Sequence, residues 1–393
     1  EVIISGTVAQ ISGSEKVWIA SRTMSESDAN GEIIFSISFS DFASNDGGEV
    51  VTTTDSSQIF YDKTVPEITF LSVLSDNEFT SSIATAGDSV TIMFQASESI
   101  QYPSVQIGGK EVSVDTSDVD DLTGAVSWVA SRAMDWEDDE GVLDFRVDYM
   151  DIGGNLGIQG SPSTFDGSMV FDRTIPSLLE IDFISNNSFY DSVAAFGDSV
   201  FLIFYTDEQI QAPVVTIGSD TVSAEGDGSS WTASKELGEE DSEGFVPFRI
   251  IYKDLGGNLG IPTTVATDSA TVSFDRTPPQ IINLIMSSDN SDSDSLAKVG
   301  TSVTVFMVSN EQVQEPQIFI SGKEAEVSGS FSYWTATMLM EEDDEEGPVS
   351  FVINFKDPAG NPGPETVSTT SGDYILFDKT DPELSDISFL FYC

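Results

Sequence analysis

The sequence predicts an all-β chain of tandem antiparallel β-sandwich domains, and three observations lead to that prediction. A motif of the form Phe/Tyr-Asp-Lys/Arg-Thr-x-Pro occurs four times, with its aspartates 110, 103 and 103 residues apart. Short runs of alternating apolar and polar residues fill the intervals. Gly, Asn, Asp and Pro separate these runs, as is typical of strands joined by turns. A period of about one hundred residues is the size of a whole small domain.

Aligning the copies predicts the domain organisation. Full repeats span 67-176, 177-279 and 280-382, and we number them 2, 3 and 4. Repeat 1, at 1-66, is incomplete because it lacks its first strands, and 383-393 resembles the first strand of a further repeat. These ends indicate a window from a longer polypeptide; the alternative is that 383-393 adds as a strand to a neighbouring chain. Repeat 2 carries a seven-residue insertion before its tryptophan, near Asp115, Asp118, Asp120 and Asp121.

The elements of one repeat follow in order along the chain. Val90, Ile92 and Phe94 lie on one face of the second strand, and the later repeats keep this pattern. Tryptophans at the repeat period are expected in the core between the sheets: Trp18, Trp128, Trp231 and Trp334. The sixth strand begins with Phe35-x-Ile37-x-Phe39 and its counterparts, which are also expected in the core. About seven strands in about one hundred residues, with no helical period, predict an immunoglobulin-like sandwich.

Further motifs recur at fixed places in the repeat: Gly-Asp-Ser-Val at 87-90 and 197-200, Trp-x-Ala, Glu-Gly and Asp-x-x-Gly-Asn. Together with the Asp-Lys/Arg-Thr-x-Pro motif they resemble the tandem bacterial-type Ig-like repeats of very large calcium-binding surface proteins and adhesins. The resemblance covers essentially the whole chain. It implies Ig-like domains at the cell surface with a structural or adhesive role.

Composition excludes several classes of function. Asp and Glu total 67 against 15 Lys and Arg, a formal net charge of −52, so nucleic acid and anionic membrane surfaces would be repelled. With no histidine and one cysteine, the chain has no Ser-His-Asp triad, Cys-His pair or ordinary zinc site. The acidic motifs recur in every copy, whereas an active site normally occurs once. We therefore expect a non-enzymatic protein. No apolar run reaches the length of a membrane helix, so no membrane insertion is expected in this segment.

The immunoglobulin-like topology predicts that acids from three distant places meet at each junction between repeats. Acidic turns end the preceding repeat, the Asp-Lys/Arg-Thr-x-Pro motif forms the linker, and two loops of the following repeat complete the set. For repeats 1 and 2 the predicted residues are Asp28, Asp62, Glu98, Asp151 and Asn155, with Asn30 in place of a glutamate. For repeats 2 and 3 they are Asp138, Glu140, Asp172, Glu208, Asp254 and Asn258. For repeats 3 and 4 they are Asp241, Glu243, Asp275, Glu311, Asp357 and Asn361. Asp344, Glu346 and Asp378 end repeat 4 in the same way.

Such a gathering of carboxylates requires a counter-ion. Two carboxylates about 4 Å apart repel by about 4 kcal/mol at an effective dielectric constant near 20. Calcium takes 6 to 8 oxygen ligands with tolerant geometry, which carboxylates and carbonyls can supply. We therefore predict structural Ca²⁺ between the repeats. The alternatives are acidic loops that are simply solvated and Asp-x-x-Gly turns that cap their own backbone.

These observations predict an extracellular structural protein, a rigid rod of Ig-like repeats in a surface filament, hair or adhesin stalk. Its partners would be neighbouring repeats or other copies of the same polypeptide. The alternative is a ligand-binding adhesin that recognises a glycan or a host surface through one specialised repeat. Trp136 is the candidate residue for that role, because it is the one tryptophan outside the periodic positions.

Overall fold

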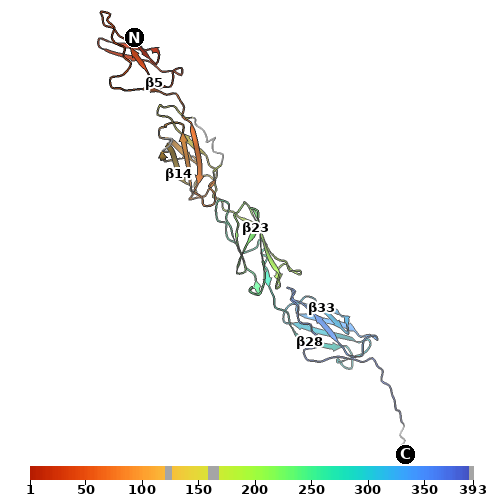
Figure 1. Cartoon of the computed structure of the whole chain (residues 1–393). Helices are drawn as coiled ribbons and strands as arrows, with labels where there is room; N and C mark the ends of the chain where they lie inside the picture. Colours follow the sequence, from red (N-terminus) through yellow and green to blue (C-terminus); the bar gives the residue numbers. More distant parts are fainter. Residues whose placement is uncertain (120–125, 158–167, 389–393) are drawn as a thin grey trace, which may run out of the picture. The chain divides into compact units, whose positions relative to one another are not determined.

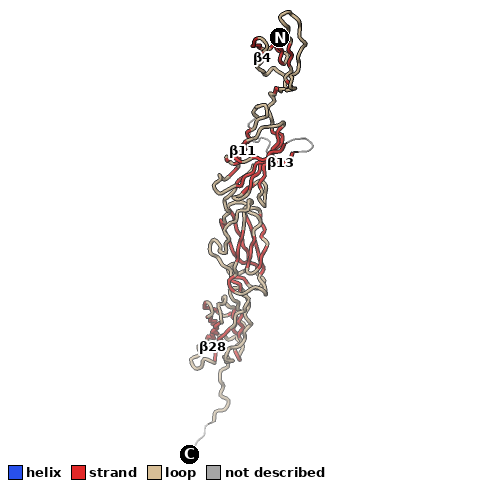
Figure 2. Tube along the Cα trace, turned by 90° about the vertical axis from the view of Figure 1, so that its left-hand side faces the viewer, coloured by secondary structure: helices blue, strands red, loops and turns tan. Residues whose placement is uncertain are grey.

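A computed structural model describes residues 1–119, 126–157 and 168–388 of the chain. Regular structure in these residues consists of β-strands, and no helix occurs among them (Figure 2). The strands pair into antiparallel sheets, with one short parallel pair in each of repeats 2, 3 and 4. The predicted fold, an all-β chain of tandem immunoglobulin-like β-sandwiches, is confirmed. Asp120 and Asp121 of the predicted insertion lie outside the described residues.

The chain divides into two compact units. Unit 1 comprises residues 1–174 with 255–258, and unit 2 comprises residues 175–254 with 259–393. Repeat 1 and nearly all of repeat 2 therefore lie in unit 1, whereas repeats 3 and 4 lie almost entirely in unit 2. We describe each unit separately.

Repeat 1, in unit 1, contains three small sheets. The first has the strand order β2-β1-β6, the second pairs β3 with β4, and the third pairs β5 with β7. The strands are β1 (Val2–Ile4), β2 (Thr7–Val8), β3 (Gln10–Ser14), β4 (Val17–Ser21), β5 (Gly31–Glu32), β6 (Phe35–Ile37) and β7 (Phe60–Tyr61). Repeat 1 lacks the two long strands that precede the tryptophan in the other repeats.

Repeat 2 shows the complete sandwich of unit 1. A four-stranded sheet has the order β13-β14-β10-β8, a second sheet has the order β12-β11-β16, and a small sheet has the order β15-β17-β9. Figure 1 labels β14, the strand that carries the tryptophan. The strands are β8 (Ile68–Ser75), β9 (Ile83–Ala84), β10 (Ser89–Ala96), β11 (Ser104–Ile107), β12 (Lys110–Val112), β13 (Val114–Val119), β14 (Val126–Ala133), β15 (Gly141–Val142), β16 (Phe145–Asp148) and β17 (Val170–Phe171).

Unit 2 repeats this arrangement twice. In repeat 3 the sheets have the orders β18-β20-β24-β23, β22-β21-β26 and β19-β27-β25. Its strands are β18 (Leu178–Ser185), β19 (Val193–Ala194), β20 (Ser199–Thr206), β21 (Val214–Ile217), β22 (Asp220–Val222), β23 (Ala224–Gly226), β24 (Ser230–Glu236), β25 (Gly244–Phe245), β26 (Phe248–Ile251) and β27 (Ser273–Phe274).

Repeat 4 has the sheet orders β28-β30-β34-β33, β32-β31-β36 and β29-β37-β35. Its strands are β28 (Ile281–Ser288), β29 (Leu296–Ala297), β30 (Ser302–Ser309), β31 (Gln317–Ile320), β32 (Lys323–Glu324), β33 (Glu326–Ser330), β34 (Tyr333–Leu339), β35 (Gly347–Pro348), β36 (Phe351–Asn354) and β37 (Leu376–Phe377).

Each complete repeat encloses its own hydrophobic core. The buried side chains of the three cores fall within residues 73–171, 181–274 and 284–377. Each core contains the predicted alternating positions of the second strand, such as Leu202 and Phe204, together with the tryptophan of the strand that pairs with it, such as Trp231. In β20 and β24 the register sets Phe204 opposite Trp231. This packing between the sheets is the source of the fold's hydrophobic stabilisation.

Repeat 1 departs from the expected core. Trp18 is 61% exposed, whereas Trp128, Trp231 and Trp334 are only 7 to 8% exposed. Phe39 is also exposed. The prediction that these two aromatic side chains are buried was therefore wrong. The physical reason is that no long strand pairs with β4, so nothing covers the ring of Trp18.

Candidate metal site

Three carboxylates converge at a junction between repeats within each unit. In unit 1, oxygens of Asp62, Glu98 and Asp151 all lie within 4.8 Å of one another. In unit 2, Asp275, Glu311 and Asp357 form the same arrangement, which is also confined within 4.8 Å. We call these the unit 1 triad and the unit 2 triad. In each, the first residue lies in the linker after a repeat, and the other two lie in loops of the following repeat.

A tight turn orients the aspartate that is most deeply buried in each triad. Asp357 is fully buried, and its Oδ1 accepts hydrogen bonds from the backbone N–H groups of Gly360 at 2.7 Å and Asn361 at 2.9 Å. Asn361 Nδ2 donates to the other carboxylate oxygen at 2.8 Å. Gly360 has φ +97°, which a residue with a side chain rarely adopts. The turn therefore presents the Asp357 carboxylate in one fixed orientation.

The asparagine of the same turn also holds the linker. Asn361 Nδ2 donates to the backbone carbonyl of Asp275 at 2.9 Å, and Asn155 Nδ2 donates to that of Asp62 at 3.1 Å. In unit 1, Asn258 Nδ2 makes the same contact with the carbonyl of Asp172 at 3.3 Å. These side chains were predicted as oxygen ligands of a metal. In the structure their amide nitrogens fasten the linker backbone to the turn.

The proximity of like charges and burial change the acidity of the triad. The pKa of Glu311 is raised, first by burial and then by the negative charges of Asp275 and Asp357. Burial, followed by the charges of Asp357 and Glu243, likewise raises the pKa of Asp275. In unit 1, burial and the charges of Asp62 and Asp151 raise the pKa of Glu98. Although burial opposes them, hydrogen bonds from Asn155 and its turn instead lower the pKa of Asp151. The raised pKa values of Glu311, Asp275 and Glu98 thus reflect burial together with neighbouring negative charge.

The Asp-x-x-Gly glutamates lie beside the linker. Glu243 Oε1 accepts hydrogen bonds from Thr277 Oγ1 at 2.8 Å and from the backbone N–H of Arg276 at 2.9 Å. Glu140 and Glu346 accept equivalent bonds from Thr174 and Thr380. In repeat 1, Asn30 takes this place, since its Nδ2 contacts Thr64 Oγ1 and its Oδ1 accepts from the backbone of Lys63. Glu243 thus adds charge next to the unit 2 triad, and Asp378 with Glu346 repeats this linker geometry after repeat 4.

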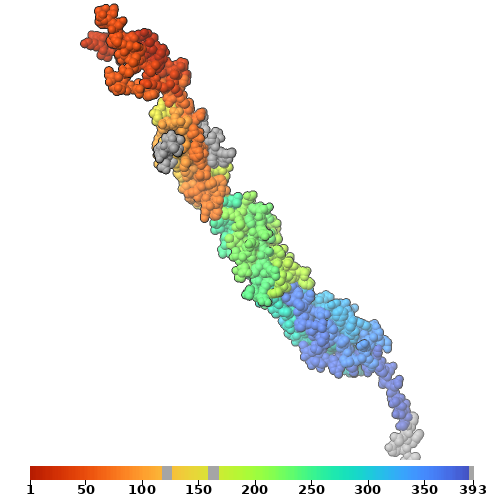
Figure 3. Space-filling model, viewed as in Figure 1, coloured from red at the N-terminus to blue at the C-terminus, as the bar shows by residue number. Residues whose placement is uncertain are grey.

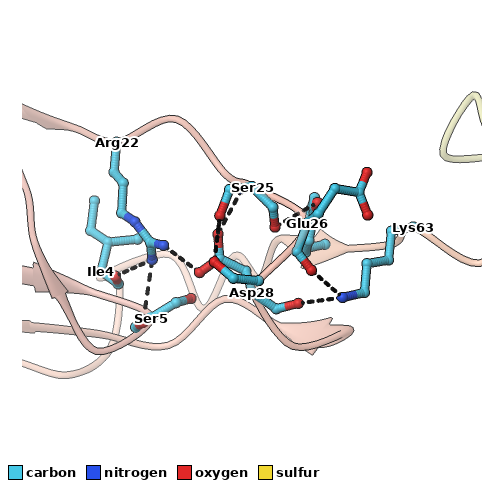
Figure 4. A network of polar contacts seen from close by, with 9 residues as sticks. Ile4, Ser5, Arg22, Ser25, Glu26, Asp28 and Lys63 are labelled. Carbon is cyan, nitrogen blue, oxygen red and sulfur yellow. Dashed lines mark hydrogen bonds and ion pairs between the residues drawn. The ribbon is translucent and has the colours of Figure 1, made fainter.

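Four predicted ligands lie elsewhere. Asp28, Asp138, Asp241 and Asp344 are absent from the carboxylate triads found among the described residues. Each is instead paired with a basic side chain, the partners being Arg22, Arg132 with Lys110, Lys235 and Lys323 respectively. In repeat 1 the guanidinium of Arg22 also donates to the carbonyls of Ile4 and Ser5, while Lys63 donates to the carbonyls of Glu26 and Asp28 (Figure 4).

Asp138 shows how basic partners keep a buried aspartate ionised. Burial alone would raise its pKa, but the hydrogen bonds from Arg132, Lys110 and the backbone of Asp135 outweigh burial and lower the pKa to about 2. Lys110 Nζ lies 2.7 Å from Asp138 Oδ1. The charge of Asp138 is therefore already neutralised by protein cations. A metal ion is not needed at these four positions.

The third predicted set spans both units. Asp172 lies in unit 1, whereas Glu208 and Asp254 lie in unit 2. Within its own unit, Asp172 Oδ1 accepts from the backbone N–H of Thr174 at 3.1 Å, as the linker aspartates of the two triads do. Ligation by this set remains a prediction from the repeat.

Sequence reasoning missed one further member of the pattern. Asp41 and Asn45 of repeat 1 form the same turn as Asp151 and Asn155, with Asn45 Nδ2 donating to Asp41 Oδ2 at 2.9 Å. Ser44 occupies the glycine position at φ +67°. Because Ser44 replaces the glycine of the Asp-x-x-Gly-Asn motif, a search for that motif does not find the turn in repeat 1. The interval of 110 residues from Asp41 to Asp151 was the available signal.

Comparisons with known proteins give only distant similarities. No protein-family model matches this sequence, and no curated protein matches it. Among solved structures, the I9–I11 tandem from titin is 6% identical, with a TM-score of 0.29 over 79% of this chain and 100% of that chain. The ectodomain of mouse nectin-like molecule 4 is 11% identical, with a TM-score of 0.25 over 77% of this chain and 98% of that chain. The fold assignment rests on the strand orders described above.

A third solved structure is a Bacteroides ovatus glucan-utilisation protein, SGBP-B, in complex with a mixed-linkage heptasaccharide. It is 15% identical, with a TM-score of 0.18 over 80% of this chain and 67% of that chain. Separately, the described residues contain no helix that is long and apolar enough to cross a membrane.

Proposed function

We propose that this chain is a non-enzymatic extracellular structural protein whose Ig-like repeats are stiffened by calcium at their junctions. In this proposal the repeats form part of a surface filament, hair or adhesin stalk. The observation that supports it is the carboxylate triad, which occurs at a junction in both units and joins the linker to two loops of the following repeat. A cation held there would connect the end of one repeat to the beginning of the next.

The ligand chemistry favours calcium. The unit 2 triad supplies three carboxylates, and Glu243 lies near enough for its charge to raise the pKa of both Asp275 and Glu311. Calcium accepts mono- or bidentate carboxylates and completes its 6 to 8 ligands with carbonyls or water at about 2.3 to 2.6 Å. Magnesium requires a stricter octahedron and retains more water. Irregular loops that offer several carboxylates therefore suit calcium better.

The mechanical consequence follows from where the ligands lie in the chain. Without an ion, the linker of repeat 3 contacts repeat 4 through the hydrogen bond between Asn361 and the Asp275 carbonyl. An ion shared by Asp275, Glu311 and Asp357 would add a charged link between that linker and two loops of repeat 4. Prolines at 278 and 279 further restrict the linker. Repetition of this junction would give a chain of stiff segments.

Isothermal titration of the full chain with calcium tests the proposal. Glu311→Gln removes one charge from the unit 2 triad, while Glu315→Gln changes an exposed glutamate nearby and serves as the matched control. We expect the control to keep the parent stoichiometry and Glu311→Gln to bind one ion fewer. Glu98→Gln should remove the ion of the unit 1 triad in the same way. Equal stoichiometry in the parent and both triad variants would refute calcium binding at the triads.

A second candidate function has one observation in its favour. Trp136 is 63% exposed in the acidic turn of repeat 2, where Arg173 donates to its carbonyl. An exposed indole can stack on a sugar ring. If this repeat recognises a glycan, Trp136→Ala should abolish binding to a glycan array while calcium stoichiometry stays unchanged. The absence of any glycan bound by the parent chain would exclude this function for Trp136.

A further inference from the structure

A second contact between consecutive repeats lies beside the unit 2 triad. The loop between β18 and β19 of repeat 3 carries Asn187, whose Nδ2 donates to the backbone carbonyl of Ala359 in repeat 4 at 2.7 Å. The same Nδ2 donates to Asp198 Oδ2, also at 2.7 Å, which holds the side chain in its own repeat. Ala359 lies in the turn that orients Asp357. The contact therefore reaches the turn that carries a triad carboxylate, without using the triad.

The aromatic ring of the same loop packs against that turn. A Cβ added at Gly360 would lie 3.0 Å from Phe189 Cε2, so the ring occupies the space left by the missing side chain. Lys356 Nζ lies 5.9 Å from the centre of the Phe189 ring, within the range of a cation–π contact. The backbone N–H of Phe189 donates to Asn187 Oδ1 at 3.0 Å, which holds the Asn187 side chain against the backbone of its own loop. Figure 3 shows the yellow-green surface from the start of unit 2 bordering the blue surface of repeat 4.

The contact recurs in unit 1. Asn77 Nδ2 donates to the carbonyl of Gly256 at 2.8 Å and to Asp88 Oδ2 at 2.7 Å. A Cβ at Gly257, which has φ +101°, would lie 2.5 Å from Phe79 Cε2. The same two residue types thus meet the same kind of turn twice. Repeat 4 keeps the asparagine as Asn290 but has Asp292 in place of the phenylalanine.

We propose that the Asn-x-Phe loop is a cation-independent latch whose partner is the Asp-x-x-Gly-Asn turn of the following repeat. The asparagine binds a turn carbonyl, and the phenylalanine fills the space that only glycine leaves open. None of these contacts involves an ion. When cations are removed, the latch keeps the two repeats joined on one side, so the junction bends about the latch rather than separating. The inference rests on the proposed structural role but not on calcium binding.

Electron–electron distance measurements on the full chain test the latch. Spin labels at Ser234→Cys and Thr337→Cys, introduced together with Cys393→Ser, occupy equivalent exposed positions of repeats 3 and 4. The test variant is Phe189→Asp, which introduces the residue that repeat 4 carries at this position. The control is Leu179→Asp, an equally charged change at an exposed position of β18. Hydrogen exchange of β20 at the parent rate confirms that each variant is folded.

In excess EGTA we expect Phe189→Asp to widen the distance distribution about twofold, because the ring then no longer packs against the turn and no cation bridges the two repeats. The Leu179→Asp control should match the parent. Gly360→Ala, which places a methyl group against the ring, should widen the distribution in the same way. Parent-like widths for both Phe189→Asp and Gly360→Ala in EGTA would overturn the latch. If calcium has no effect on the parent but Phe189→Asp still widens the distribution, the calcium proposal fails and the latch stands.

Discussion

Asp138 and Asp151 both open an Asp-x-x-Gly turn in repeat 2, and both are buried. Their neighbours differ. Arg132 and Lys110 pair with Asp138, whereas the charged partners grouped with Asp151 are Asp62 and Glu98. The charge of Asp138 is therefore neutralised by basic side chains of the protein, whereas Asp151 lies in a cluster of negative charge. The same short motif is a structural ion pair in one place and a candidate metal ligand in the other.

Replacing Asp138 tests the structural role. Asp138→Asn leaves Arg132 and Lys110 without their carboxylate, and removal of one partner of a buried pair costs about 3 kcal/mol. We expect the amides of β14, which carries Arg132, to exchange correspondingly faster when hydrogen exchange is followed by mass spectrometry. Asp139→Asn alters an exposed neighbour and should leave β14 unchanged. Equal exchange rates of β14 in the two variants would show that the ion pairs of Asp138 do not contribute to stability.

The raised pKa values of the unit 2 triad predict a pH dependence in the absence of cations. Burial and neighbouring charges raise the pKa of Glu311 above its usual 4.5, so the folded chain binds protons more readily than the unfolded chain. The free energy of unfolding therefore increases as pH falls through the folded pKa and is reduced above it. In EGTA at pH 7, Glu311→Gln should accordingly melt at a higher temperature than the parent.

This advantage of Glu311→Gln should disappear below the usual pKa of the glutamate, where the parent is itself protonated. The exposed Glu315→Gln control should show no such change with pH. With calcium at pH 7 the order should reverse, because the parent then gains an ion that the variant binds less well. A lower melting temperature for Glu311→Gln in EGTA at pH 7 would contradict the electrostatic account of the triad.

The sequence carried part of this distinction. A basic residue stands six positions before Asp28, Asp138 and Asp241, within the tryptophan strand of the same repeat or directly after it. In repeat 4 that position is Met338, and Lys323 pairs with Asp344 instead. The six-residue spacing therefore indicated ion pairing for three of the aspartates. It could not identify Lys323 of β32 as the partner of Asp344. That partner depends on how two separate strands come together.

At the scale of strands and turns, the hairpin before the tryptophan places a glycine opposite it in repeats 1, 3 and 4, whereas repeat 2 has Thr116 there. In repeat 3, Gly226 ends β23, and a Cβ there would lie 2.2 Å from the backbone oxygen of Ser230 and 2.8 Å from the Trp231 ring. Gly13 and Gly329 meet the same backbone position in repeats 1 and 4. In these three repeats the close approach of the two strands beside the tryptophan leaves no space for a side chain.

Substitution of this glycine should therefore destabilise its sheet. We expect Gly226→Ala to cost about 1 to 3 kcal/mol, because the added methyl group forces the strands apart. Gly238→Ala in the same repeat is the matched control, since nothing lies within 4 Å of its added Cβ. Hydrogen exchange of β24 measures the difference. Similar protection in both variants would show that the hairpin adjusts without cost.

The long strands were predictable and the short ones were not. In β10, β20 and β30 the second, fourth and sixth residues are apolar and buried, as Val200, Leu202 and Phe204 are in β20, so the period of two identified these strands directly. The parallel pairs such as β19 with β27 join two-residue strands that are distant in sequence. Two residues are too few to show a period. The Asn-x-Phe loop was missed for a related reason, because its partner lies in the next repeat and only the folded chain brings them together.

For the whole molecule, the central claim is that cations stiffen the junctions between repeats. The sequence predicted which repeats carry acids at their ends, and the structure brings three of those acids together in each unit. Asp28, Asp138, Asp241 and Asp344 are not part of these triads, and each is paired with a basic side chain instead. What sequence could not provide is the charge balance of each loop, which decides where a cation would be favoured.

Small-angle X-ray scattering of the full chain, in calcium and then in excess EGTA, tests this claim most directly. We predict a maximum dimension that is larger in calcium and that shortens in EGTA by roughly 30 Å, about the length of a ten-residue strand. A variant with Glu98, Glu208 and Glu311 all changed to glutamine should give the EGTA profile under both conditions. A parent chain whose scattering is the same in calcium and in EGTA would contradict the account.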